Sequence, residues 1–140
     1  MSAGIKLGID FGTQRVGLAS SDSSGIAVTP IGSYSIEDSV KKLHEIAGEN
    51  PIIVIYLGLP RHLAGSEGQS AVSVREFAKE IKALNLAPVF LVDERLTTTS
   101  ASQKKDLVQK FGIDAIAAQE ILEFALNGER LLGGFFGESI

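Results

Sequence analysis

Short apolar runs separated by turn-forming residues occupy the first part of the chain, and this pattern predicts strands ahead of any helix. The runs are Ile5–Ile9, Arg15–Ser20 and Ile26–Val28. A Gly-Thr-Gln connection between the first two runs suits a hairpin. Pro30 is expected to close the third strand, because proline has no amide hydrogen for a strand ladder. We therefore expect three meandering strands before the first helix.

Helical periodicity then alternates with further apolar runs. Val40, Leu43 and Ala47 share one helical face, whereas the unbroken run Ile52–Leu57 is typical of a strand buried on both faces. The elements predicted after the hairpins are a helix over Glu37–Gly48, a strand over Ile52–Leu57, a helix that begins at the capping-box pair Ser66 and Gln69, a strand over Pro88–Val92, a helix from Thr98 or Thr99 to about Gln109, and a last helix that opens at Ile113-Asp114.

This β-β-β-α-β-α-β-α-α order predicts an α/β fold, with a five-stranded mixed sheet and helices on both faces. Residues 1–140 are expected to form a single domain, because no linker, repeat or low-complexity tract interrupts them. The glycine-rich tail over residues 130–140 is expected to fray or to pack against a partner.

Composition narrows the class of protein. Of 140 residues, 44% are apolar and 21% charged, which is ordinary for a globular domain. Cysteine is absent, and this excludes disulfides, zinc–thiolate sites and thiol catalysis. No apolar run approaches the roughly 18 residues of a membrane span, and no basic and apolar leader precedes the first strand. We expect a cytoplasmic protein that does not contact a membrane.

The charge balance counts against broad, nonspecific binding of nucleic acid. The 13 Lys and Arg residues are outnumbered by 17 Asp and Glu residues, for a net charge of -4. Lys104, Lys105 and Lys110 form a basic strip that Asp106 interrupts, and either nucleic-acid contact or a solvated helix face explains it. Few aromatic residues are available as a stacking platform for single strands. An enzyme that gathers acids around metal ions remains compatible with this balance.

Three acids are candidates for such chemistry. Asp10 ends the first strand and opens the run Asp10-Phe11-Gly12-Thr13, where a carboxylate beside a glycine can face a metal ion or a phosphate. Asp93-Glu94 follows the fifth strand, and Asp114 lies at a helix start; the carboxyl ends of parallel strands meet at one edge of a sheet. Asp93 and Glu94 alternate across the strand, and we favour Glu94 as the residue that faces the site. The alternatives are that Asp10 accepts amide hydrogen bonds in a tight turn and that Asp114 is only a helix N-cap.

Several short motifs occur together in a recognisable order. They are Gly8–Gly17, Ser21-Asp22, Gly58-Leu59-Pro60, Gly65–Gly68, Asp93–Thr98 and Ile113–Ala118 followed by Ile121-Leu122. In this order, and over roughly Ile5 to Leu126, the chain resembles the YqgF/RuvX family. Members of that family have the RNase H-like fold of Holliday-junction resolvases, and they are provisionally described as nucleases of the 16S rRNA precursor.

The resemblance implies a metal-dependent endonuclease that hydrolyses phosphodiester bonds in maturation of the 16S rRNA precursor, with cleavage of Holliday junctions or other branched DNA as the alternative. It further implies two Mg²⁺ or Mn²⁺ ions, with Asp10 as the bridging ligand and Glu94 and Asp114 completing the site. These three acids are then both the metal ligands and the catalytic residues. Structured RNA or branched DNA is the expected partner, and a monomer and a homodimer both remain open.

Basic and hydroxyl residues near these acids are candidates for substrate binding. Thr13 can offer its hydroxyl to a phosphate, and Arg61 lies in a loop expected to border the cleft. Arg15 either contacts a phosphate or projects from an edge strand. Arg95 can orient Glu94, clamp the scissile phosphate or form a plain salt bridge. The full set is Thr13, Arg15, Arg61, Arg95, Lys104 and Lys105.

Two other classes of function compete with a nuclease. One is a non-catalytic module that binds nucleic acid or protein, as in related domains of larger transcription factors that lack the acids. The other is an ATP-dependent phosphotransferase, because Asp-x-Gly-Thr also resembles the phosphate loop of the sugar kinase/actin superfamily. Those enzymes close two domains on a nucleotide, and 140 residues have room for one.

Overall fold

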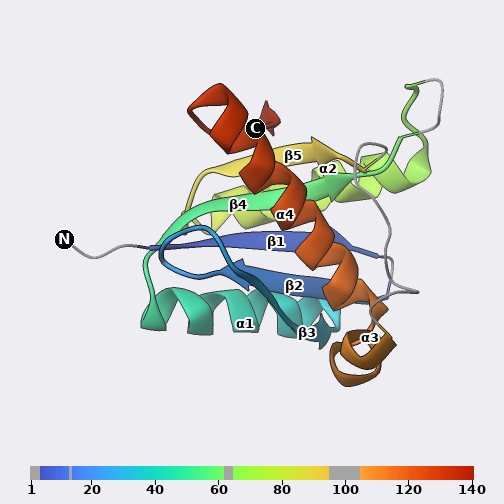
Figure 1. The fold of residues 1–140 in the computed structure, drawn as a ribbon. Helices are drawn as coiled ribbons and strands as arrows, with labels where there is room; N and C mark the ends of the chain where they lie inside the picture. Colours follow the sequence, from blue (N-terminus) through green and yellow to red (C-terminus); the bar gives the residue numbers. More distant parts are fainter. Residues whose placement is uncertain (1–3, 13, 62–64, 95–104) are drawn as a thin grey trace.

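A computed structural model describes residues 4–12, 14–61, 65–94 and 105–140 and shows a central sheet with helices on both faces (Figure 1). The elements in chain order are β1 (Ile5–Phe11), β2 (Val16–Ser21), β3 (Val28–Tyr34), α1 (Ile36–Glu49), β4 (Ile52–Leu59), α2 (Gln69–Ala83), β5 (Val89–Asp93), α3 (Lys105–Phe111), α4 (Ile113–Leu132) and β6 (Glu138–Ser139). Among the helices in these ranges, none is long and apolar enough to cross a membrane.

The sheet has the strand order β3-β2-β1-β4-β5-β6. β1, β4 and β5 are parallel neighbours, and β2, β3 and β6 pair antiparallel to the strands beside them. The carboxyl ends of β1, β4 and β5 therefore lie at one edge of the sheet, which is where an α/β sheet binds ligands.

Residues of β1 alternate between the two faces of this sheet. Leu7 and Ile9 are fully buried in the larger core, with α1 and α2. Gly8 and Asp10 point to the opposite face, which α4 crosses diagonally over the strands (Figure 1). A smaller core fills the space beneath α4; its buried members are Val54, Tyr56, Val92, Ile121, Leu122, Ala125 and Leu126.

The third strand differs from its prediction. It was expected over Ile26–Val28 with Pro30 as its end, but β3 runs from Val28 to Tyr34 through the proline. Pro30 is tolerated because β3 is an edge strand that pairs only with β2. A register shift also leaves Ile31 without an opposite residue, and such bulges accommodate proline.

The sheet has six strands rather than the predicted five. β6 pairs antiparallel with β5, so that Ser139 lies opposite Phe90. The ring of Phe136 packs edge-on against Phe124 of α4, and its backbone N–H donates to the Tyr56 hydroxyl at 3.0 Å. α4 continues to Leu132, and the tail after it is held by an aromatic contact and a strand pairing, whereas packing of the tail against a partner stays a prediction.

The predicted start of α2 differs from the observed one, and the predicted start of the next helix cannot be compared with the structure. The prediction that Ser66 and Gln69 form a capping box is wrong, because the N-cap of α2 is Gly68 and no side chain caps the helix. Thr98 and Thr99, the expected start of the next helix, lie outside the described residues; the described part of this region is α3.

Candidate active site

Asp10 belongs to a row of residues that runs across three strands on the face covered by α4. Asp10 of β1 lies opposite Gly17 of β2, and Gly17 lies opposite Ser33 of β3. Residues directly opposite each other in neighbouring strands point to the same face of a sheet. The middle position of this row has no side chain, and this absence leaves room above β2.

The first turn of α4 occupies that room. A Cβ atom at Gly17 would overlap the carbonyl oxygen of Asp114, so the helix backbone contacts the strand where only glycine fits. Asp114 is thereby placed between Asp10 on one side and Ser33 on the other. Asp114 is not the N-cap of α4, since Gly112 holds that position, and the N-cap alternative is wrong.

A second glycine makes room for Glu94. Glu94 follows β5 and lies two residues after Val92, which is opposite Gly58 of β4. A Cβ atom at Gly58 would overlap Oε1 of Glu94 and lie 2.5 Å from Ile121. The Glu94 side chain therefore lies across the bare backbone of β4 and reaches Asp10, with which it forms a side-chain hydrogen bond.

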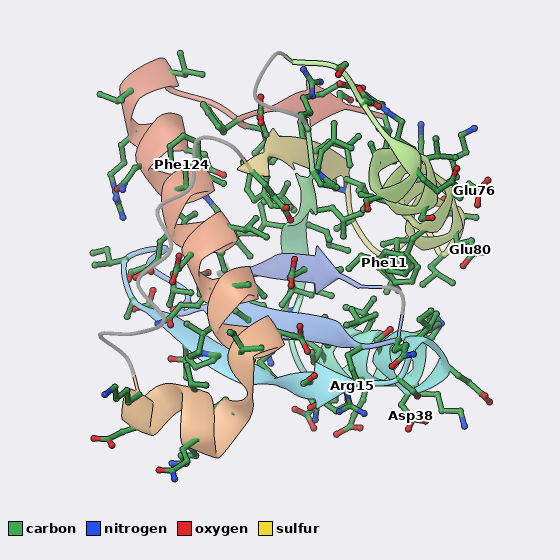
Figure 2. The ribbon with its side chains drawn as sticks, turned by 90° about the vertical axis from the view of Figure 1, so that its right-hand side faces the viewer. Phe11, Arg15, Asp38, Glu76, Glu80 and Phe124 are labelled. Carbon is green, nitrogen blue, oxygen red and sulfur yellow. The ribbon has the colours of Figure 1, made fainter. Side chains whose placement is uncertain are left out.

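Phe11 fixes the end of β1 from the other face. Its ring stacks on Phe77 of α2 with 4.4 Å between ring centroids, in the region that Figure 2 shows beside α2. Because successive strand residues point to opposite faces, this contact turns Asp10 toward α4 and Glu94.

The electrostatics of Asp10 and Glu94 are those of a pair of carboxyls that share a proton. Burial, the charge of Asp10, the hydrogen bond to Asp10 and the charge of Asp93 raise the pKa of Glu94 to about 7. Burial also raises the pKa of Asp10, and the charge of Asp114 adds to this, while the hydrogen bond from Glu94 opposes it. Two adjacent carboxyls cannot both ionise at low cost, and a site of this kind attracts divalent cations.

Asp114 has its own partners on the β3 side. The Ser33 hydroxyl donates to Oδ2 of Asp114 at 3.0 Å. Arg15 in turn donates from Nε to the Ser33 hydroxyl at 3.2 Å and from its terminal nitrogen to the Ser33 carbonyl at 2.5 Å. Figure 2 shows Arg15 at the end of the sheet near α1. Of the three predicted acids, Asp10 and Glu94 are in direct contact, and Asp114 acts on Asp10 through its charge.

The donor set suits a hard divalent cation, because Mg²⁺ and Mn²⁺ take carboxylate oxygens together with water. The shared proton of Asp10 and Glu94 is what a cation would displace. Within the described residues, however, no three Asp, Glu, His or Cys side chains are close enough to form one metal-holding group. Asp10 and Glu94 form the nucleus of the site, and Asp114 lies beside it.

The residues predicted to bind substrate are less completely placed. Thr13, Arg95 and Lys104 lie outside the described residues, and Lys105 is exposed at the start of α3. Arg61 lies 3.6 Å from both Glu67 and Glu138 in an ion-pair network.

The same two glutamates bind Arg75 of α2 at 2.7 Å. This network ties the loop after β4 to α2 and β6, and the contacts of Arg61 within it are structural.

Ser33 is a site residue that the sequence did not reveal. It lies in a strand without a recognisable motif, and its contact with Asp114 joins residues 81 positions apart. Gly17 and Gly58 belong to the recognised motifs, but their role in making room for Asp114 and Glu94 depends on which elements cross above them.

Solved structures with the same fold identify the fold class. Over 98% of this chain and 99% of the other, the structure matches Thermus thermophilus RuvC in complex with a Holliday junction substrate, with a TM-score of 0.57 and 12% identity. A second structure of Thermus thermophilus RuvC matches with a TM-score of 0.50. The chain therefore has the RNase H-like fold of RuvC.

The family model for RuvX, described as Holliday junction resolvase, matches residues 4–128. A Streptomyces avermitilis protein is 40% identical over 100% of this chain and 96% of its own length. A Mycobacterium ulcerans protein is 41% identical over 94% of this chain and 83% of its own length. The names of both relatives assign them provisionally as pre-16S rRNA nucleases. The chain belongs to the RuvX family, and the resemblance to the YqgF/RuvX family inferred from its motifs is confirmed.

Proposed function

We propose that this RuvX-family chain is a metal-dependent endonuclease, with the 16S rRNA precursor as its first candidate substrate and the cytoplasm as its place of action. The observation that carries the proposal is the Asp10–Glu94 carboxyl pair at the carboxyl edge of the parallel strands, with Asp114 beside it. The names of the relatives support the substrate.

Each acid has a distinct part in this proposal. Asp10, at the centre of the edge, would be the principal metal ligand, and Glu94 and Asp114 would supply further carboxylate oxygens. Mg²⁺ or Mn²⁺, when bound, would lower the pKa of an attacking water and stabilise the leaving oxygen. Asp10 and Glu94 would have to give up their shared proton to hold such a cation.

The glycines and Phe11 hold this arrangement in place. Gly17 and Gly58 allow the approach of Asp114 and Glu94. Phe11, stacked on Phe77, keeps Asp10 on the α4 face. A rigid scaffold of this kind positions catalytic groups before substrate arrives.

The test replaces Asp10 with Asn, which keeps the shape of the side chain and removes its charge. Cleavage of a 16S rRNA precursor fragment in Mg²⁺ should fall by more than about 100-fold, beyond the range for groups that only orient a ligand. Asp38→Asn, on the exposed first turn of α1, is the matched control and should cleave like the unaltered protein. Equal cleavage by Asp10→Asn and Asp38→Asn would remove the proposed site.

The same assay separates the alternatives. Cleavage of a four-way DNA junction in preference to the RNA would favour a resolvase, which the family description and the RuvC fold support. Failure of the unaltered protein to cleave either substrate or to bind Mn²⁺ would favour a non-catalytic binding module. Sedimentation of the same preparation distinguishes a monomer from a homodimer.

A further inference from the structure

Ser33 connects Asp114 to a permanent positive charge. The hydroxyl of Ser33 donates to Oδ2 of Asp114 at 3.0 Å and accepts from Nε of Arg15 at 3.2 Å. A second bond, from the Arg15 terminal nitrogen to the Ser33 carbonyl at 2.5 Å, fixes the guanidinium against the β3 backbone. Three hydrogen bonds thus join β3, the residue that precedes β2, and α4.

The direction of this chain of hydrogen bonds follows from chemistry. Arginine carries only donors and keeps its proton, so the Ser33 oxygen must accept from Arg15. A hydroxyl has a single hydrogen, and this hydrogen is therefore directed to Asp114. The Ser33 hydroxyl is therefore held as a donor to one oxygen of Asp114.

Geometry makes Ser33 the group that orients Asp114. Ser33, Gly17 and Asp10 form one row across the sheet, and Asp114 sits above the middle of it. The N-cap of α4, Gly112, also lies against Ser33, since a Cβ atom there would be 3.4 Å from the Ser33 Cβ. One carboxylate oxygen is bound on the β3 side, while Asp10 lies on the other side of the row.

We propose that Ser33, held by Arg15, is a positioning residue: it binds one oxygen of Asp114 and so orients this carboxylate as one that would help Asp10 to hold a divalent cation. This inference rests on the proposed function, because it assigns Ser33 to the same acid site. It also gives Arg15 a role within the protein, in place of direct contact with a substrate phosphate.

The test compares three serine variants by Mn²⁺ binding, measured by calorimetry and electron paramagnetic resonance. Ser33→Ala removes the donor, and Ser33→Thr retains a hydroxyl. The matched control is Ser24→Ala, because the Ser24 hydroxyl also donates to an aspartate, Oδ1 of Asp22 at 2.8 Å, in the exposed β2–β3 connection. Thermal melts of each variant check that it is folded.

Ser33→Ala should weaken Mn²⁺ binding by about 10-fold or more, as removal of groups that orient metal ligands commonly does. Ser33→Thr should restore most of the affinity, and Ser24→Ala should match the unaltered protein. In the metal-free protein, the carboxyl ¹³C resonance of Asp114 should move in Ser33→Ala and stay in place in Ser24→Ala. Removal of Arg15 by Arg15→Ala should weaken binding in the unaltered background and add little to Ser33→Ala.

Asp10→Asn is the second reference variant, and it should abolish Mn²⁺ binding. If it does so while a folded Ser33→Ala variant keeps its Mn²⁺ affinity, this inference is overturned and the proposed function stands. An affinity loss in Ser33→Thr as large as in Ser33→Ala would also overturn it, because the hydroxyl would then not be the active group. Failure of the unaltered protein to bind Mn²⁺ would overturn the proposed function and this inference together.

Discussion

Two glutamates, one near each end of α4, have opposite surroundings: Glu129 is paired with a cation, and Glu94 lies against another acid. Near the end of the helix, Glu129 bonds to Lys6 and to the Tyr56 hydroxyl, and its side chain is 12% exposed. Near the start of the helix, Glu94 instead meets Asp10, another carboxyl, and burial and this neighbour raise its pKa to about 7. The two sites lie on the same face of the same sheet.

This difference is consistent with a structural role for Glu129 and with the binding role proposed for Glu94. A buried acid with a cation and a hydroxyl beside it is satisfied within the protein. The protein therefore has the means to pair a buried glutamate, yet it places Glu94 against another acid. Contact between two carboxyls that raises their pKa values is more common at functional sites than elsewhere in proteins.

The largest expected effect comes from Gly17→Ala, a variant that disturbs the acid site and leaves the contact between Lys6 and Glu129 intact. Gly17→Ala places a Cβ atom onto the carbonyl oxygen of Asp114, and α4 must move off β2. We expect the free energy of unfolding to fall by about 3 kcal/mol, the upper part of the range for overpacking. Urea denaturation measures this change.

Gly48→Ala is the matched control for that variant. Gly48 lies in α1, and nothing lies within 4 Å of the position that its Cβ would take. Alanine there should raise the free energy of unfolding by about 0.5–1 kcal/mol, because glycine is unfavourable inside a helix. A loss of stability in Gly17→Ala no larger than the change in Gly48→Ala would contradict the close contact between β2 and α4.

The next largest effect is expected when the ion pair between Lys6 and Glu129 is removed. Glu129→Gln leaves Lys6 without its ionised partner in a place where the two side chains are 20% and 12% exposed. We expect a loss of about 2 kcal/mol in the free energy of unfolding, between the values for surface pairs and fully buried pairs. Chemical denaturation at pH 7 measures it, with Glu76→Gln on the exposed side of α2 as the control (Figure 2).

The smallest expected effect has the opposite sign: replacing Glu94 should raise the free energy of unfolding, whereas replacing Glu129 should lower it. Glu94→Gln removes a charge from beside Asp10, so the metal-free protein should become more stable at pH 7. The expected gain is about 1–2 kcal/mol, because each pKa unit corresponds to about 1.4 kcal/mol and partial exposure of Glu94 reduces the effect. A loss comparable with that of Glu129→Gln would show that the two sites do not differ as described.

The pH dependence of the free energy of unfolding also tests the surroundings of Glu94 in the metal-free protein. The pKa of Glu94 is higher in the folded state, at about 7, than its ordinary value of 4.5. The folded state therefore binds more protons than the unfolded state between these values, and the contribution of Glu94 to stability is lost as pH rises from 4.5 to 7. Glu94→Gln should flatten this slope in urea titrations, whereas Glu76→Gln should leave it unchanged.

Strand and helix positions could be predicted from the sequence where a local pattern was strong. The run that became β4 and the periodic face of α1 were recognised within a few residues of their bounds. β3 was cut short at Pro30, because a sequence does not show that a strand will lie at the edge of a sheet. β6 was missed because two residues make no pattern of their own.

In the candidate site, too, residues with a local sequence signal could be predicted and the others could not. Asp10 and Glu94 were predicted because each acid directly follows an apolar strand, and the structure brings them into contact. The role of Asp114 as a ligand stays a prediction, although the structure places its charge beside Asp10. Ser33 could not be predicted, since nothing near it in the sequence indicates Asp114.

The sequence by itself determined the apolar runs, their order, the family motifs and the placement of acids at strand ends, because these depend on residues close together in the chain. Only the tertiary structure decided which acid touches which, that α4 rests on Gly17, and that Ser33 and Arg15 bind around Asp114. Those contacts arise where strands distant in sequence lie side by side beneath one helix, and their geometry is set by packing and by the space that two glycines leave open.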